Sequence, residues 1–167
     1  MILISFSMDS FQELPCEGNG FLTFHARRLL KSLHHWTGRQ LIDATASSID
    51  QARTLFYAPF IVLSHNREAE PILNYANQAA LNLFELTWHE LVRMPSRLTA
   101  EPLHQAERSR LLATVNKHGF IDDYRGVRIS KCGRRFMIEQ ATVWNLLDEN
   151  SAPYGQAATF SQWAYVS

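Results

Sequence analysis

The sequence predicts an α+β fold in which short helices cover one face of a five-stranded antiparallel sheet. The C-terminal third contains three long segments rich in apolar and aromatic residues, at 120–130, 134–147 and 154–163. Gly133 allows a tight turn between the first two, and the polar segment 148–153 separates the second from the third. Such a meander cannot bury its own apolar face, so the preceding residues must cover it.

A helix is predicted near the N-terminus, over 21–36. Its apolar residues follow a 4-3-4-3 spacing and form one stripe, made of Leu22, Ala26, Leu29, Leu33 and Trp36. We expect this packing helix to lie on the outer face of the sheet or to pair with a second copy of the chain. Gly38 is expected to end it. A second helix is expected over 48–57, where Ser48 and Gln51 have the spacing of a capping box.

Short apolar runs and capping residues predict the elements between this helical region and the meander. In chain order, these elements are strands over 60–64 and 72–75 and helices over 78–84, 88–94 and 102–118. Asn77 and Thr87 are expected to cap the first two of these helices, and Thr99 the third. Gly119 is expected to end the third helix.

Composition and charge restrict the class of protein. Residues 1–19 are expected to form a loosely ordered lead-in, and Met8 is an alternative start to Met1. The formal net charge is zero, which gives no electrostatic footprint for nucleic acid or for an anionic membrane. No apolar run approaches the ~20 residues of a membrane span. Cys16 and Cys132 make no disulfide framework, so we expect a cytoplasmic protein that binds neither nucleic acid nor membranes.

Three local segments resemble the pattern of PAS domains. Residues 72–80 (ILNYANQAA) are similar to its strand-to-helix segment, residues 83–91 (LFELTWHEL) to the segment that follows, and residues 133–139 (GRRFMIE) to its hairpin. The resemblance implies a five-stranded antiparallel sheet in the order 2-1-5-4-3, with short helices over one face. It also implies an N-terminal helical extension over 20–58 and a PAS-like core over 59–167.

Longer strings are similar to one PAS-like family, the MEKHLA domain. The resembling stretches lie at 55–65, 71–84, 94–101, 124–130, 133–136, 143–145 and 155–160. The resemblance spans about residues 20–163 and points to the free-standing bacterial or cyanobacterial form of the family. The plant form lies at the C-terminus of homeodomain–leucine-zipper transcription factors. The string MEKHLA that names the plant domain is absent here.

The resemblance implies a sensory or interaction module that binds a small molecule or a protein partner and performs no catalysis. A homodimer would form through the N-terminal helix or through the sheet. Two alternatives stay open. One is a small enzyme of unrecognised type that uses Glu139, Arg125 and a histidine. The other is a ligand-free scaffold for protein interactions, whose cavity is filled by its own aromatic side chains.

Side-chain alternation along the strands selects the candidate pocket residues. The PAS alignment places the face with Met137 and Glu139 inward on the middle strand of the meander, and a β-bulge would reverse that assignment beyond it. The candidate set is Val62, Asn74, Trp88, Arg125, Val127, Met137, Glu139, Ala141, Gln156, Ala158 and Phe160.

Several candidates also have a plainer interpretation. Arg125 and Glu139 could bind a polar ligand group or form an ordinary ion pair between neighbouring strands. Trp88 and Trp144 could stack on a flat ligand or fill the core. Asn74 is expected to point into the cavity.

The sequence also restricts the cofactors. A flavin–cysteinyl photoadduct needs a cysteine on the helices between the second and third strands, and residues 78–118 contain none. Haem needs an axial ligand, and His89, His104 and His118 are equally consistent with solvent-facing histidines, so haem is not expected. Cys132, which lies beside three basic residues, is a candidate redox site or an ordinary turn residue. No spacing of ligating residues predicts a metal site.

Overall fold

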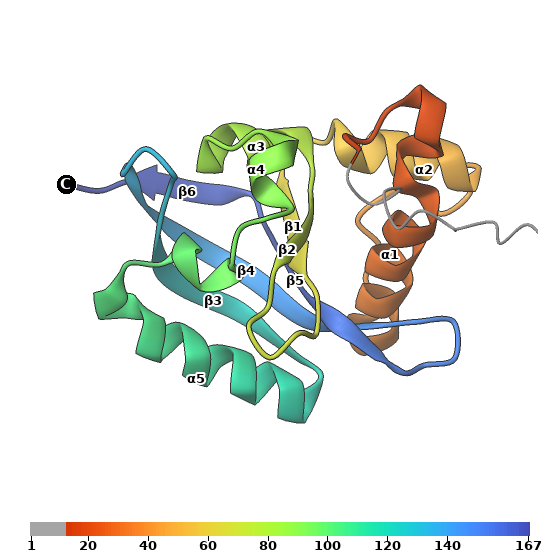
Figure 1. The fold of residues 1–167 in the computed structure, drawn as a ribbon. Coiled ribbons are helices and arrows are strands. Elements are labelled where there is room, and N and C mark those ends of the chain that lie inside the picture. Colours follow the sequence, from red (N-terminus) through yellow and green to blue (C-terminus); the bar gives the residue numbers. More distant parts are fainter. Residues whose placement is uncertain (1–12) are drawn as a thin grey trace, which may run out of the picture.

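The structure, a computed structural model, describes residues 13–167 and contains one antiparallel sheet. Met1, Met8 and most of the predicted lead-in lie outside the described residues. Five strands are arranged in the order β2-β1-β5-β4-β3, which confirms the predicted order (Figure 1). The strands are β1 (Ile61–His65), β2 (Leu73–Ala76), β3 (Phe120–Ile129), β4 (Arg135–Leu147), β5 (Pro153–Phe160) and β6 (Gln162–Tyr165).

The sequence does not predict β6. The segment expected as one strand over 154–163 is interrupted at Ser161 and continues as β6. β5 pairs with β4 from Thr142 onward, and β6 pairs with β4 from Phe136 to Glu139. Both strands therefore lie along the same side of β4, one after the other.

The helices agree with the predicted set and add two 3₁₀ segments. They are η2 (Glu17–Leu22), α1 (Thr23–Thr37), α2 (Ser48–Phe56), α3 (Gln78–Phe84), α4 (Trp88–Leu91), η3 (Ser96–Thr99) and α5 (Pro102–His118). Asn77 and Thr87 cap α3 and α4 as predicted, each through a side-chain oxygen that accepts a backbone N–H. Two predicted caps are wrong. Ser47 caps α2, one residue before the expected position, and Glu101 precedes α5 in place of Thr99, which belongs to η3.

Helices cover both faces of β4. Val143 packs with Leu111 and Val115 of α5, whereas the neighbouring Trp144 joins the large core that contains Leu29 and Leu33 of α1. Alternation along the strand explains this division, because consecutive side chains point to opposite faces. Figure 1 shows α1 beside α2, with the sheet between them and α5. The PAS-like helices therefore cover one face, and the N-terminal extension covers the other.

The apolar stripe of α1 is buried within the chain. Ala26, Leu29 and Leu33 are at most 1% exposed, and the Trp36 indole donates a hydrogen bond to the Asn145 carbonyl at 2.9 Å. Leu22, the remaining member of the stripe, precedes the helix. The homodimer stays a prediction. A dimer formed through α1 would have to use residues outside the buried stripe.

A buried polar chain joins α1 to the sheet. His25 Nε2 lies 2.9 Å from Ser64 Oγ of β1, and that hydroxyl donates to Asn74 Oδ1 of β2 at 2.6 Å. The His25 ring stacks on Tyr75 with centroids 5.3 Å apart. Burial lowers the pKa of His25 to about 3, so the imidazole is neutral at physiological pH. The Asn74 side chain therefore belongs to this hydrogen-bond network, on the α1 side of the sheet.

Two β-bulges interrupt the pairing of β3 with β4. The register shifts by one residue between Ile121 and Tyr124 and again between Tyr124 and Gly126. Asp123 on β3 and Gln140 on β4 have positive φ angles of 56° and 51°, which is unusual for residues other than glycine. Each extra residue reverses the faces of the side chains that follow it.

We expect Leu29→Ala to lower the free energy of unfolding by about 2–5 kcal/mol, because the deletion leaves a cavity between α1 and β4. Phe24→Ala is the matched control, since Phe24 is 77% exposed on the same helix. Its effect should stay within about 0.5 kcal/mol. Urea denaturation measures both values. Equal losses for the two variants would contradict the packing of α1 on the sheet.

We expect acid to destabilise the fold through His25. Above pH 6.5 the imidazole is neutral in both the folded and unfolded states. Below it, the unfolded state takes up a proton that the folded state excludes, so stability falls as pH falls toward the folded pKa of about 3. At pH 5 this amounts to about 2 kcal/mol.

The measurement is urea denaturation from pH 8 to pH 5. His25→Gln should show a shallower pH dependence than the wild type, whereas His34→Gln, which changes an exposed residue of the same helix, should not. Identical slopes for the wild type and His25→Gln would show that His25 is not buried in its neutral form.

Candidate functional site

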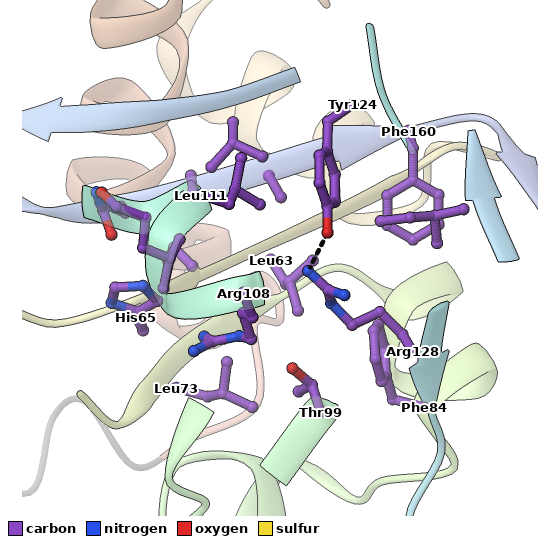
Figure 2. Close-up of a pocket in the computed structure, with 17 residues that line it drawn as sticks. Leu63, His65, Leu73, Phe84, Thr99, Arg108, Leu111, Tyr124, Arg128 and Phe160 are labelled. Atoms are coloured by element: carbon purple, nitrogen blue, oxygen red, sulfur yellow. Dashed lines mark hydrogen bonds between the residues drawn. The ribbon is translucent and has the colours of Figure 1, made fainter. Parts of the chain in front are cut away.

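A cavity lies between the inner face of the sheet and the helices η3 and α5 (Figure 2). Its volume is about 70 Å³, and its lining is mostly apolar. Apolar side chains come from β1, β2, α5, β4 and β5, namely Leu63, Leu73, Leu111, Ile138, Val143 and Phe160. Polar residues in the wall are Ser64, His65, Thr99, Arg108, Tyr124, Arg128 and Gln156. The cavity therefore combines an apolar surface with a few convergent polar groups, as ligand sites do.

Two arginines stand out in this wall, Arg108 of α5 and Arg128 of β3. They are only 8% and 7% exposed. Arg108 donates one hydrogen bond, to Ser96 Oγ at 2.9 Å. Arg128 donates to the Val127 carbonyl at 2.8 Å and to the Tyr124 hydroxyl at 3.2 Å. Among residues 13–167, neither guanidinium forms a salt bridge with a carboxylate.

The buried position of Arg108 disfavours the charged form of its guanidinium. Burial, and to a smaller extent the positive charge of Arg128, lowers the pKa of Arg108 to about 10. The group is still protonated at neutral pH. Arg108 and Arg128 therefore add two positive charges to the wall of one cavity.

His65 completes the polar part of the wall. Its Nδ1 lies 2.9 Å from the Asn66 carbonyl and must donate to it, which leaves Nε2 as an acceptor. That nitrogen is buried and has no hydrogen-bond partner among the described residues. Burial lowers the pKa of His65 to about 4, so the ring is neutral. An unsatisfied buried acceptor of this kind calls for an explanation.

Tyr124 and Arg128 face the cavity because the bulge at Asp123 sets the parity of β3. Gly126 lies between them on the same face, and a side chain there would collide with the Tyr124 ring. The ring therefore has room to lie against the Arg128 guanidinium, which is 5.5 Å from its centroid. The Tyr124 hydroxyl also donates to the exposed carboxylate of Glu107 at 3.3 Å.

The predicted inner face of β4 needs correction. Ile138 lines the cavity and Phe136 packs against Phe84 of α3, so Met137 and Glu139 point to the opposite face. Beyond the bulge at Gln140 the parity reverses, and Val143 lines the cavity. Ala141, which was predicted for the pocket, is fully buried in the core and does not line the cavity.

The bulge at Asp123 places Arg125 and Val127 on the outer face of β3. The Arg125 Nε donates to Glu139 Oε1 at 3.1 Å, and these side chains are 66% and 47% exposed. This is the plainer of the two interpretations, an ion pair between neighbouring strands. It lies outside the cavity, so the enzyme that would use Arg125 and Glu139 has no support in this geometry.

Of the eleven pocket candidates, Gln156, Ala158 and Phe160 of β5 line the cavity. Val62 and Asn74 lie on the α1 side of the sheet, where Asn74 accepts from Ser64. Trp88 is buried in the core, as is Trp144. The β5 residues lie on the face that alternation predicts, because that strand carries no bulge along its pairing with β1.

Sequence reasoning missed His65, Arg108, Tyr124 and Arg128. A signal existed for Arg108, which precedes Leu111 by three residues and Val115 by seven and so lies on the apolar stripe of α5. A charged residue on a stripe that packs against a sheet indicates a buried charge. Arg128 gave no such signal, because its face depends on the bulges.

The remaining predicted sites lie away from the cavity. Cys132 is exposed in the turn between β3 and β4. His89 and His118 are exposed, and neither they nor His104 line the cavity. Within residues 13–167 no group of three ligating side chains is close enough to hold a metal ion, and no helix is long and apolar enough to cross a membrane.

A surface hollow of about 440 Å³ adjoins the cavity. It is lined by the loop after β1, by α5 and by the start of β5. His65, Leu112 and Gln156 belong to the walls of both spaces. These three side chains therefore separate the cavity from the surface and mark its access route.

Comparison with protein families gives a match to the MEKHLA domain over residues 23–165. The chain belongs to the MEKHLA domain family. Curated relatives include the homeobox-leucine zipper protein ATHB-9 of Arabidopsis thaliana, 32% identical over 101 residues, which are 59% of this chain and 12% of the relative. Another is HOX32 of Oryza sativa subsp. indica, 26% identical over 146 residues, 84% of this chain and 16% of the relative. The MEKHLA chain thus spans about one sixth or less of these relatives.

Solved structures show the PAS fold. The PAS domain of a Colwellia psychrerythraea protein matches with a TM-score of 0.58 and 14% identity, covering 70% of this chain and 94% of that one. An RNA-binding light-oxygen-voltage receptor matches with a TM-score of 0.58 and 13% identity, over 74% of this chain and 36% of that one. These likenesses establish the architecture of the MEKHLA chain as PAS-like.

We expect Glu139→Gln to change the free energy of unfolding by less than about 1 kcal/mol, because the ion pair with Arg125 is exposed to solvent. Urea denaturation tests this value. A loss of several kcal/mol would mean that Glu139 is buried against the cavity, as the alternation of an unbulged strand predicts.

Proposed function

We propose that the MEKHLA chain is a PAS-like sensory domain that binds a small molecule in the cavity between the sheet and α5. The observation that supports the proposal is the cavity wall, where apolar side chains surround buried polar groups without a full set of partners. In a protein selected for stability alone, such groups would be paired or replaced. Binding then acts on α5 and η3, which contribute Arg108 and Thr99 to the wall.

The arrangement gives little support to catalysis. Among the described residues, those that line the cavity include no carboxylate and no thiol. The buried Ser64 donates its proton to Asn74, so His25 is not placed to accept that proton as a general base. The ligand-free scaffold also fits poorly, because the aromatic side chains leave the volume beside Arg108 unfilled.

A flavin is a poor fit to this site, although one of the similar structures is described as a light-oxygen-voltage domain with a flavin analogue. A volume of about 70 Å³ is far below that of pockets for drug-sized ligands, roughly 300–1,000 Å³. We expect a ligand of few heavy atoms.

The origin and the partner of the domain are further proposals. The relatives named above are plant homeobox-leucine zipper proteins and do not support the expected free-standing bacterial or cyanobacterial form. A protein partner, the homodimer and a cytoplasmic location stay predictions. None of them is needed for ligand binding, which the cavity alone can provide.

We expect small molecules of about four to eight heavy atoms to bind the wild-type chain and not Ala158→Leu. Ala158 lines the cavity, so the larger side chain fills it, at a cost in stability of about 1–3 kcal/mol. Ligand-observed NMR with a mixed set of neutral, cationic and anionic fragments measures binding. Native mass spectrometry of freshly purified protein detects a ligand that copurifies.

Ala106→Leu is the matched control, because Ala106 is exposed on α5. Val143→Ile adds a single methylene to the cavity and serves where Ala158→Leu disturbs the fold. Fragments that bind the wild type, Ala158→Leu and Val143→Ile equally well, or a wild type that binds none of them, would overturn the proposal.

A further inference from the structure

The two buried arginines set a requirement on the ligand. Charged side chains are almost never fully buried unless they are paired, because removing an ion from water costs several kcal/mol. Arg108 and Arg128 are both more than nine-tenths buried. Each lies in the wall of the cavity rather than within close-packed protein. A counter-ion inside the cavity would compensate both charges together.

Residues 13–167 supply only neutral partners to these two guanidinium groups. A guanidinium has five N–H donors, and the hydrogen bonds of Arg108 account for one of them. Those of Arg128 reach a carbonyl and the Tyr124 hydroxyl. The nearest carboxylate in this network is that of Glu107, which bonds to Tyr124 and is itself exposed. The pair is therefore neutralised by no acidic group among the described residues.

Figure 2 shows Arg108 and Arg128 in the wall of one cavity. The Arg108 side chain ends on the His65 side of this cavity, and the Arg128 guanidinium lies beside the Tyr124 hydroxyl, to which it donates a hydrogen bond. The apolar side chains of Leu63, Leu73 and Leu111 also border the cavity. A fitting ligand carries negative charge at one end and apolar atoms at the other.

We propose that the cavity binds a small organic carboxylate, whose carboxylate group is held by Arg108 and Arg128 and whose apolar part contacts the leucines of the wall. This inference rests on the proposed function, the binding of a small molecule in the cavity. The planar guanidinium matches a carboxylate through two parallel hydrogen bonds. Inorganic phosphate shares the negative charge, but its oxygens point in all directions, and a mostly apolar wall leaves some of them without donors.

Size limits the carboxylate to a short chain. A volume of about 70 Å³ leaves room for few heavy atoms. Acetate, propionate and butyrate are therefore suitable probes. The hollow bordered by His65, Leu112 and Gln156 provides their route to the surface.

The test is isothermal titration calorimetry of the full chain, at low ionic strength in a buffer without phosphate. The probes are acetate, propionate and butyrate, each compared with the alcohol and the amide of the same length and with inorganic phosphate. We expect the carboxylates to bind at least tenfold more tightly than their neutral analogues and than phosphate.

The variants are Arg108→Met and Arg128→Met, which keep much of the side-chain length and remove the charge. Each should weaken carboxylate binding at least tenfold. Arg125→Met is the matched control, because Arg125 is exposed on the outer face and should leave binding unchanged. Without ligand, Arg108→Met should melt no lower than the wild type, since replacing a buried charge by an apolar residue is often stabilising.

Different failures have different meanings. If the alcohols or amides bind as tightly as the carboxylates, the carboxylate inference is overturned and the proposed small-molecule site stands. Tighter binding of phosphate also overturns it. If neither these probes nor the neutral fragments bind, both proposals fail. If Arg108→Met fails to fold, Arg108→Gln and Arg128→Met are tested in its place. An unchanged carboxylate affinity in these two variants contradicts the inference.

Discussion

The covering of β4 on both faces is the constraint on which the rest of the structure depends. α1 buries the side that carries Trp144, and α5 buries the side that carries Val143. Neither face is left to solvent along this part of the strand, so each side chain of β4 must fit one of two cores. The bulges at Asp123 and Gln140 adjust that fit, and the bulge at Asp123 places Tyr124 and Arg128 in the cavity rather than on the surface.

The architecture could be predicted from the sequence because its signals are local. Asn77 and Thr87 cap their helices through hydrogen bonds that span three residues, and Gly119 ends α5 with a positive φ of 94°. The apolar stripe with Leu29 and Leu33 likewise predicts a buried helix face. The face of the sheet to which each side chain of β3 and β4 points could not be predicted, because one extra residue in a strand reverses every side chain that follows it. Neither Asp123 nor Gln140 is a glycine, the residue that would mark a bulge in the sequence.

The site follows from these local reversals. Candidates on β5 lie where alternation puts them, whereas Arg125, Met137 and Glu139 lie on the far side of the sheet. Of the two buried charges in the cavity wall, Arg108 lies on the apolar stripe of α5, whereas the face of Arg128 depends on a bulge that the sequence does not reveal. Their burial lowers the stability of the ligand-free fold, and an anion in the cavity would restore it.

In the proposed site, Arg108 and Arg128 together hold a carboxylate. The most direct measurement is an NMR spectrum of the arginine side-chain N–H groups during titration with propionate. We predict that the signals of Arg108 and Arg128 shift together with a single affinity, while that of the exposed Arg125 stays in place. Unchanged signals for both buried arginines at a propionate concentration that saturates the protein would contradict it.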